Sequence, residues 1–302
     1  MATLYTHQSA NSRKTWLLMG SFLVLIVSLG WFFSYYYGNP AILYAAVIFS
    51  IIANFGSYWW SDKIVLALTR ARPADEIEYQ ELHRLVENLA ITAGLPKPRL
   101  FVVDDPAPNA FATGRDANHA AVAVTTGLLG TLERSELEGV IAHELSHIGN
   151  RDILISTIVV VLVGFVSIAS DFFLRTARFG GRRGSRGGGQ IQAVFFFLGV
   201  FFVILAPIVA QLIRLAISRK REFLADASGA LLTRYPEGLA GALRKISLYD
   251  GRMLYAHHAT AHLFIANPFG SRRVLGFLDR IFSTHPPIEE RVAALLGQRA
   301  GL

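Results

Sequence analysis

A stretch without a single charged side chain, residues 15–61, constrains the fold of this chain more than any other feature. One membrane crossing needs only about 20 apolar residues, so this stretch is long enough for two crossings. A Gly-Asn-Pro turn at residues 38–40 interrupts it, which predicts a transmembrane helical hairpin over residues 16–60. Tyr and Trp lie at the ends of both segments, as is typical of the membrane–water boundary.

Two later apolar runs, residues 153–174 and 190–217, predict a second transmembrane hairpin. The turn between them, residues 175–189, is rich in Gly and Arg. Hydrophobic residues make up 52% of the 302-residue chain, which agrees with an integral membrane protein. The remaining segments are an N-terminal tail at residues 1–15 and two parts of one soluble domain at residues 61–152 and 218–302.

The distribution of Lys and Arg predicts the orientation of these hairpins. Basic residues flank the first hairpin on both sides and its turn carries none, which places both of its ends in the cytosol. Five arginines in the second turn argue for the opposite side. We give more weight to the first hairpin, because the first spans usually set the orientation. A second hairpin that does not fully cross the bilayer is the alternative.

An H-E-x-x-H motif lies just before the third apolar run. Apolar residues recur around it at helical spacing and a capping-box pattern begins at Ser135, so we expect a helix that starts there. On this helix His143 and His147 project from the same face and can bind one Zn²⁺. Glu144 lies beside them as a general base for a metal-activated water. A surface helix with solvated His and Glu side chains is the alternative interpretation.

The third metal ligand must be sought elsewhere in the chain. There is no cysteine, so a zinc ion has to be held by His and carboxylate groups. Ile153 stands where metzincins carry a third His, which excludes that class. Asp152 is too close along the chain to fold back, and Asp171 is expected across the membrane. Glu222 follows the fourth apolar run on the side of the paired histidines, and Asp226 can accept the spare N–H of a ligating His.

Five motifs in order, N-A-F-A-T-G, H-E-L-S-H-I-G-N-R-D, a hydrophobic hairpin, R-E-F-L-A-D and T-H-P-P-I-E-E-R, resemble one family over nearly the whole chain. This family is the membrane-embedded gluzincins related to the HtpX heat-shock protease, with the CAAX prenyl endopeptidase as a more distant relative. The resemblance implies a mainly α, integral membrane fold with two transmembrane hairpins and a zincin-like α+β catalytic domain containing a small β-sheet. It also implies one Zn²⁺ per chain on His143, His147 and Glu222, with Glu144 as the general base.

The same resemblance implies an endopeptidase of the bacterial inner membrane, with its catalytic domain facing the cytoplasm. Its partners would be the lipid bilayer and polypeptide substrates, mainly misfolded or damaged membrane proteins. The formal net charge of +7 would suit nucleic acid, but no basic groove with interleaved aromatic residues is visible, so we expect no nucleic-acid partner. Nothing in the sequence sets an oligomeric state.

Residues before the H-E-x-x-H helix are candidates for substrate binding. Short strands are predicted at residues 100–103 and 120–124. The free edge of such a sheet can pair with an extended peptide, although an ordinary hairpin packed under the helix fits the pattern equally well. Asn109 and Ala110 resemble the gluzincin edge strand that holds substrate. His285, followed by two prolines, can donate a hydrogen bond to an oxyanion or serve as a structural residue before the last helix.

Other classes of protein fit the sequence less well. A channel or transporter would need ionisable groups inside its spans, and the four apolar runs carry essentially none away from their ends. An inactive membrane scaffold descended from a protease would be expected to have lost a ligand or the base. Within the proteases, a dedicated prenyl-protein processing enzyme is the second interpretation, but the short chain and four spans argue against a large enclosed chamber.

Overall fold

The computed structural model describes most of the chain, namely residues 4–179, 219–255, 257, 259–270 and 286–297. The chain is mostly helical and contains one small mixed β-sheet. The second arm of the predicted second hairpin, residues 190–217, and the candidate oxyanion donor His285 lie outside the described residues.

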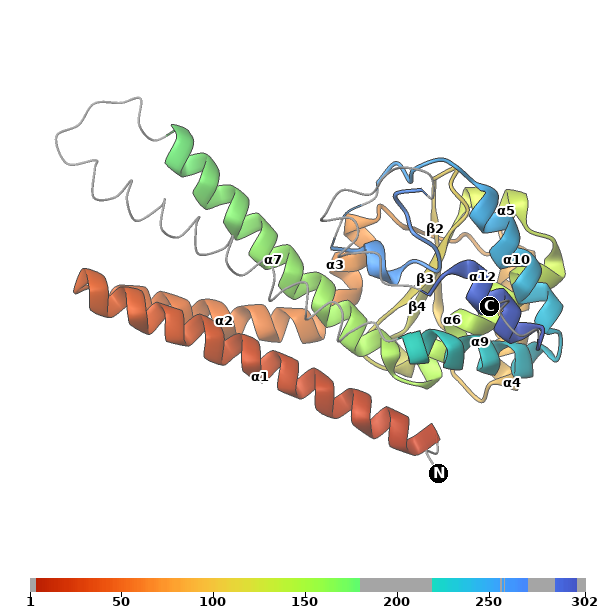
Figure 1. Cartoon of the computed structure of the whole chain (residues 1–302), viewed down its shortest axis with the longest axis horizontal. Helices are drawn as coiled ribbons and strands as arrows, with labels where there is room; N and C mark the ends of the chain where they lie inside the picture. The colour runs from red at the N-terminus through yellow and green to blue at the C-terminus, as the bar shows by residue number, and fades with distance from the viewer. Residues whose placement is uncertain (1–3, 180–218, 256, 258, 271–285, 298–302) are drawn as a thin grey trace.

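Two long helices form a hairpin that, like helix α7 (Asp152–Phe179), projects from the domain that contains the sheet (Figure 1). Helix α1 covers Leu4–Tyr37 and helix α2 covers Ala41–Trp59, with a tight turn at Gly38 where φ is 63°. Both are long and apolar enough to cross a membrane, as the charge-free stretch predicted. The predicted N-terminal tail, residues 1–15, is helical from Leu4, where α1 begins.

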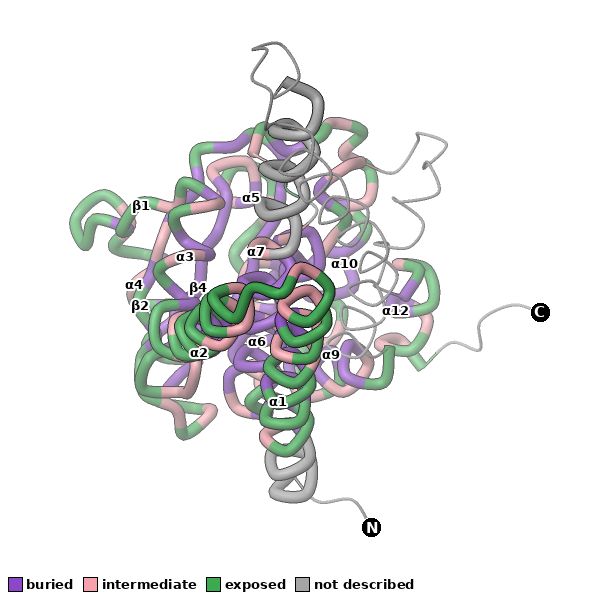
Figure 2. Tube along the Cα trace, turned by 90° about the vertical axis from the view of Figure 1, so that its left-hand side faces the viewer, coloured by how far each residue is buried: buried purple, intermediate pink, exposed green. Residues whose placement is uncertain are grey.

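Helix α7 (Asp152–Phe179), the first arm of the predicted second hairpin, packs against α1, α2 and the short helix α3 (Ser61–Leu68). It follows the H-E-x-x-H helix after a bend of 84°, and these two helices together are long and apolar enough to form a third, broken span. The buried side chains between the long helices include Leu18, Met19, Phe22 and Ile26 of α1, Ala53 of α2, and Leu154, Ile155, Ile158, Val159, Leu162 and Val163 of α7. Much of the remaining surface of α1 and α2 is exposed, as lipid-facing helices require (Figure 2).

The sheet has four strands in the order β1-β2-β4-β3. Their bounds are Arg72–Pro73 for β1, Arg99–Val103 for β2, Ala110–Thr113 for β3 and Ala121–Thr125 for β4. The two predicted strands correspond to β2 and β4, but they are parallel, so the interpretation as an ordinary hairpin is wrong. The N-A-F-A-T segment between them forms β3, which pairs antiparallel with β4 and lies at the edge of the sheet.

Helices cover the sheet and enclose the core of the domain. They are α4 (Gln80–Thr92), α5 (Thr126–Thr131), α6 (Arg134–Gly149), α9 (Arg219–Thr233), α10 (Pro236–Leu248) and α12 (Ile288–Leu295), with 3₁₀ turns η1 (Ala117–His119) and η3 (Ala261–Leu263). Helix α6, which carries the H-E-x-x-H motif, contacts α4, α9, α10 and β3 and is therefore central. Its apolar residues Val140, Ile141 and Leu145 are at most 1% exposed.

The predicted capping box of this central helix is displaced by two residues. Glu133, rather than Ser135, is the N-cap, and it exchanges hydrogen bonds with Glu136. The Glu136 carboxylate accepts from the backbone N–H of Glu133 at 2.8 Å and also from Lys245 of α10 at 2.7 Å. The additional ion pair between Glu136 and Lys245 favours a helix start at Glu133 over one at Ser135. Local spacing in the sequence does not reveal this contact with α10.

Candidate metal centre

Two imidazoles of α6 come together inside the domain. His143 and His147 lie one helical turn apart, and their Nε2 atoms are 3.2 Å from each other. The side chain of His143 is 1% exposed and that of His147 is 16% exposed. The pair is therefore shielded from bulk water, with His147 on the more open side.

Helix α9 brings a carboxylate to the same point. The Oε2 atom of Glu222 lies 3.8 Å from Nε2 of His143, and its Oε1 atom lies 3.7 Å from Nε2 of His147. One ligand atom from each of the three residues falls within 4.8 Å of the others. The structure therefore places the predicted ligands together, although the chain leaves the domain between α6 and α9.

A glycine allows the two helices to approach this closely. Gly229 of α9 faces the backbone of His143, and a Cβ atom at this position would lie 2.9 Å from the backbone nitrogen of His143. Real Cβ atoms essentially never make so short a contact, so any larger residue would move one helix. Glu222, Asp226 and Gly229 share one face of α9, because they are spaced four and three residues apart.

The donor set and its geometry fit a tetrahedrally coordinated metal such as zinc. Ligand atoms at 2.0–2.1 Å from a tetrahedral zinc are about 3.3 Å from each other, close to the separations seen here. The Nδ1 atoms of both histidines point at carboxylates, at 2.9 Å for His143 and 3.1 Å for His147. Their Nδ1–H groups donate to these carboxylates, so the lone pairs of both Nε2 atoms face the same point. A cation bound there would remove the repulsion between the two lone pairs.

The support of His143 comes from the interior of the domain. Asp226 of α9 accepts from its Nδ1 and is held in turn by Arg291 of α12 through two hydrogen bonds, 2.8 Å from Nε and 2.6 Å from a terminal nitrogen. Arg291 is fully buried and also donates to the carbonyl of Ile265 at 3.2 Å. Burial by itself raises the pKa of Asp226, but the hydrogen bonds from Arg291 and His143 outweigh it and hold this pKa well below its ordinary value.

The support of His147 comes from the base of the long helices. Asp152, the first residue of α7, accepts from Nδ1 of His147 at 3.1 Å. The other oxygen of Asp152 accepts from the side-chain amide of Asn11 in α1 at 2.7 Å and lies 3.5 Å from Arg221. Burial by itself lowers the pKa of His147. The hydrogen bond to Asp152 and the nearby carboxylates raise this pKa by more than burial lowers it, to about 9.

The sequence did not predict the supporting role of three of these residues. Asp152 lies too close along the chain to be predicted as a ligand, yet this closeness lets it reach Nδ1 of His147. Arg291 belongs to the T-H-P-P-I-E-E-R motif, which could have drawn attention to it. No sequence signal points to Asn11, whose partner is 141 residues away.

Glu144 occupies the position expected of a general base. It follows His143 directly on α6 and is 2% exposed. Burial raises the pKa of its carboxyl group, and the neighbouring His143 and His147 oppose this rise only in part. A carboxylate with a raised pKa is a stronger proton acceptor near neutral pH.

The candidate substrate residues lie at the outer edge of β3. Asn109 is 2% exposed, and its side chain binds Ala266, donating to the carbonyl at 3.0 Å and accepting from the N–H at 3.3 Å. The carbonyl of Ala110 accepts from the N–H of Ile265 at 3.0 Å. The edge is therefore paired with the chain itself at this position. Strand alternation turns the backbone groups of Ala112 toward the same outer edge.

Comparisons with known proteins identify the family of this chain. Residues 76–299 match the family described as "Peptidase family M48". A "Protease HtpX homolog" from Caldanaerobacter subterraneus subsp. tengcongensis is 46% identical over 297 residues, covering 97% of each chain. A protein of the same name from Pyrococcus furiosus is 48% identical over 284 residues, covering 93% of this chain and 94% of its own.

A solved structure, titled "Crystal Structure of S. mikatae Ste24p", is similar to 96% of this chain and 67% of its own, with a TM-score of 0.48 and 18% identity. The family match covers most of the chain, and the relatives align over nearly their full length. The motif, the clustered His-His-Glu set and the apolar hairpin agree with that match. The chain therefore belongs to peptidase family M48 and is a membrane metalloprotease.

Proposed function

We propose that this protein is a zinc-dependent endopeptidase that hydrolyses misfolded or damaged membrane proteins at the cytoplasmic face of the bacterial inner membrane. The observation that carries the proposal is the convergence of His143, His147 and Glu222, with buried Glu144 next to the first ligand. Two imidazoles and a carboxylate are a donor set that catalytic zinc sites use. The relatives named as HtpX protease homologues support a peptidase activity.

In the proposed reaction each residue of the site has its own role. When bound, zinc would lower the pKa of a water and polarise the carbonyl of the scissile peptide. Glu144 takes the proton from the attacking water and then delivers it to the leaving nitrogen, so it acts first as a base and then as an acid. Asp226 and Asp152 keep the Nδ1 protons of the two histidines in place, which leaves both Nε2 atoms available as ligands.

Substrate would bind as an added strand along the outer edge of β3. Ala110 and Ala112 turn their backbone groups to this edge, and an extended peptide there would run beside α6, which contacts β3. Asn109 would position this edge through its bonds to Ala266. Because Ile265 donates to Ala110, the segment around Ile265 would have to shift for pairing at that residue. His285 stays a predicted donor to the oxyanion.

The position of the long helices supports a membrane-protein substrate. Asn11 in the candidate span of α1 binds the carboxylate that supports His147, so the centre lies at the base of the hairpin. A segment pulled from the bilayer would therefore enter the site over a short distance. The basic residues that flank the hairpin favour a cytoplasmic location for the catalytic domain.

The experiment that tests this function compares wild type, Glu144→Gln and Glu138→Gln as full-length, detergent-purified proteins. Glu138 is a matched control, because it lies on the same helix and pairs with Arg134 at its surface. We expect Glu144→Gln to keep about one zinc per chain and to lose at least 100-fold in cleavage of an unfolded membrane protein, within the range for general-base removal. Glu138→Gln should cleave normally. Full activity in Glu144→Gln would refute the proposal.

A further inference from the structure

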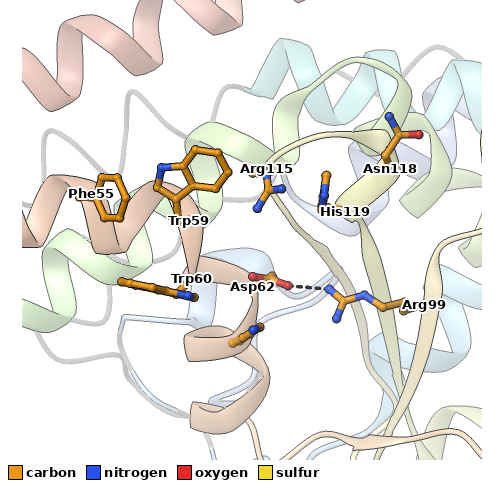
Figure 3. Close-up of a pocket in the computed structure, with 9 residues that line it drawn as sticks. Phe55, Trp59, Trp60, Asp62, Arg99, Arg115, Asn118 and His119 are labelled. Carbon is orange, nitrogen blue, oxygen red and sulfur yellow. Dashed lines mark hydrogen bonds and ion pairs between the residues drawn. The ribbon is translucent and has the colours of Figure 1, made fainter.

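A pocket separate from the metal centre lies where the first hairpin meets the domain (Figure 3). It has a volume of about 710 Å³. Its walls come from the end of α2, the start of α3, strand β2 and the region from the end of β3 to η1. The pocket is thus built from both a candidate membrane span and the catalytic domain.

One side of this pocket is aromatic. Phe55, Trp59 and Trp60 line it and are 55%, 44% and 50% exposed. The ring of Phe55 packs against both tryptophans, with centroid distances of 6.0 Å and 5.9 Å. These residues end the candidate span of α2, and Trp at the end of a span marks the membrane–water boundary. This side of the pocket therefore faces the depth at which lipid headgroups begin.

The opposite side is polar and carries positive charge (Figure 3). Arg115 reaches across to α2, where its guanidinium lies 4.6 Å from the ring centre of Trp59. Arg115 also lies 3.4 Å from Asp116, which pairs with His119 at 2.7 Å. This arginine connects the aromatic side of the pocket to its charged side.

The charges of the pocket do not cancel. Arg99 pairs with Asp62 at 2.5 Å, and Arg115 pairs with Asp116 at 3.4 Å. Lys63 is exposed at the start of α3, and no carboxylate in the described part of the chain forms an ion pair with it. Three cations therefore line the pocket and two of them are paired with carboxylates, which leaves an excess of one positive charge beside the rings. Arg99 pairs through one terminal nitrogen and Arg115 through its Nε, so each guanidinium has further N–H groups that can donate to a second acceptor.

We propose that this pocket binds the phosphate headgroup of an anionic glycerophospholipid, with the acyl chains lying along the aromatic side. The ligand must be an amphiphile, because cations and apolar rings line opposite walls at the membrane boundary. A free phosphate would leave the rings without a role, whereas a lipid engages both walls. Anionic headgroups gain about 1 kcal/mol per nearby Lys or Arg, which corresponds to about fivefold in affinity.

Tryptophan fluorescence can test this binding directly. The chain has four tryptophans, so Trp16→Phe with Trp31→Phe leaves only Trp59 and Trp60, both of which line the pocket. This full-length protein in neutral detergent is titrated with brominated phosphatidylglycerol or brominated phosphatidylcholine, since bromine quenches nearby indoles. We expect saturable quenching at about fivefold or more lower concentration of phosphatidylglycerol.

Variants of the charged wall provide the second arm. Lys63→Ala and Arg115→Gln should each raise the dissociation constant about fivefold, whereas Lys63→Arg should preserve it. Arg84→Ala is the matched control, since Arg84 is an exposed cation of α4 that does not line the pocket. Zinc content is measured in parallel and should not change, which separates this site from the metal centre.

Three outcomes would overturn the proposal. Equal quenching by both lipids would mean that the cations play no part. Equal weakening by Lys63→Ala and Arg84→Ala would mean that overall charge, rather than this pocket, attracts the lipid. Displacement of the lipid by glycerol 3-phosphate at equal concentration would mean that the site recognises a free phosphate.

Discussion

The two histidines of the metal centre are supported by different regions of the molecule. His143 is held by Asp226 and Arg291, from α9 and α12 in the core of the domain. His147 is held by Asp152 and Asn11, which belong to the bases of α7 and α1. Each imidazole has a carboxylate at its Nδ1, but only the carboxylate on His143 is closed off by a bidentate arginine.

This difference indicates a rigid inner half and an adjustable outer half of one centre. The inner half is sealed, since Arg291 is 0% exposed and Asp226 has a 3% exposed side chain. The outer half connects the metal ligand to the long helices through Asp152, the first residue of α7, and through the hydrogen bond from Asn11 of α1 to Asp152. We therefore expect losses on the inner side to affect both folding and metal binding, and losses on the outer side to affect mainly metal binding.

The largest expected effect comes from Arg291→Met. This change leaves the Asp226 carboxylate buried without its cation, and breaking one side of a buried pair costs about 3–5 kcal/mol of folding free energy. Urea denaturation of the full-length protein in detergent would measure this loss. The double variant Arg291→Met with Asp226→Leu should recover part of it, because no uncompensated charge remains. An unfolding free energy unchanged in Arg291→Met would remove the distinction between the two halves.

A matched pair of amide substitutions sharpens the comparison. Asp226→Asn and Asp152→Asn each keep the shape of the side chain but weaken the acceptor that fixes a ligand. Loss of such partners lowers metal affinity about 10–100-fold, and we expect Asp226→Asn near the upper end and Asp152→Asn near the lower end. Competition with a zinc chelator would give both affinities. The reverse order would show that His147, not His143, is the more tightly organised ligand.

The smallest effect is expected from Asn11→Ala. It removes one hydrogen bond to Asp152, while Arg221 remains 3.5 Å from the same carboxylate. Loss of one hydrogen bond to a charged group amounts to about 1.5–3 kcal/mol at most, and the remaining partner should reduce the effect to a few-fold in zinc affinity. Thr15→Ala serves as a control, because its hydroxyl donates within α1, to the carbonyl of Asn11. A Thr15 variant weaker in zinc binding than Asn11→Ala would contradict the proposed connection.

The sequence predicted those parts of the protein that depend on local pattern. An absence of charge over residues 15–61 is sufficient to predict the hairpin, and two histidines four residues apart must share a helix face. Glu222 is predicted by exclusion among the acidic residues that follow the motif, because Asp152 lies too close along the chain and Asp171 is expected across the membrane. These inferences use only spacing, polarity and the limits that a bilayer imposes.

The remaining features depend on how the chain turns. Between α6 and α7 the chain bends by 84°, and Arg151 adopts a left-handed conformation with φ 57°. This reversal brings Asp152 back to His147. Linear spacing does not predict it, because a residue other than glycine rarely adopts the left-handed conformation. In the same way, the parallel pairing of β2 with β4 depends on β3 turning to the far edge of the sheet.

The measurement that tests the central claim most directly is the zinc content of Glu144→Gln with and without Glu222→Ala. The Glu144→Gln background prevents self-digestion from confusing the result. If α6 and α9 close around one ion, the single variant should carry about one zinc per chain and the double variant almost none after equal dialysis. About one zinc per chain in both proteins would contradict the account, because the carboxylate of α9 would then not be a ligand.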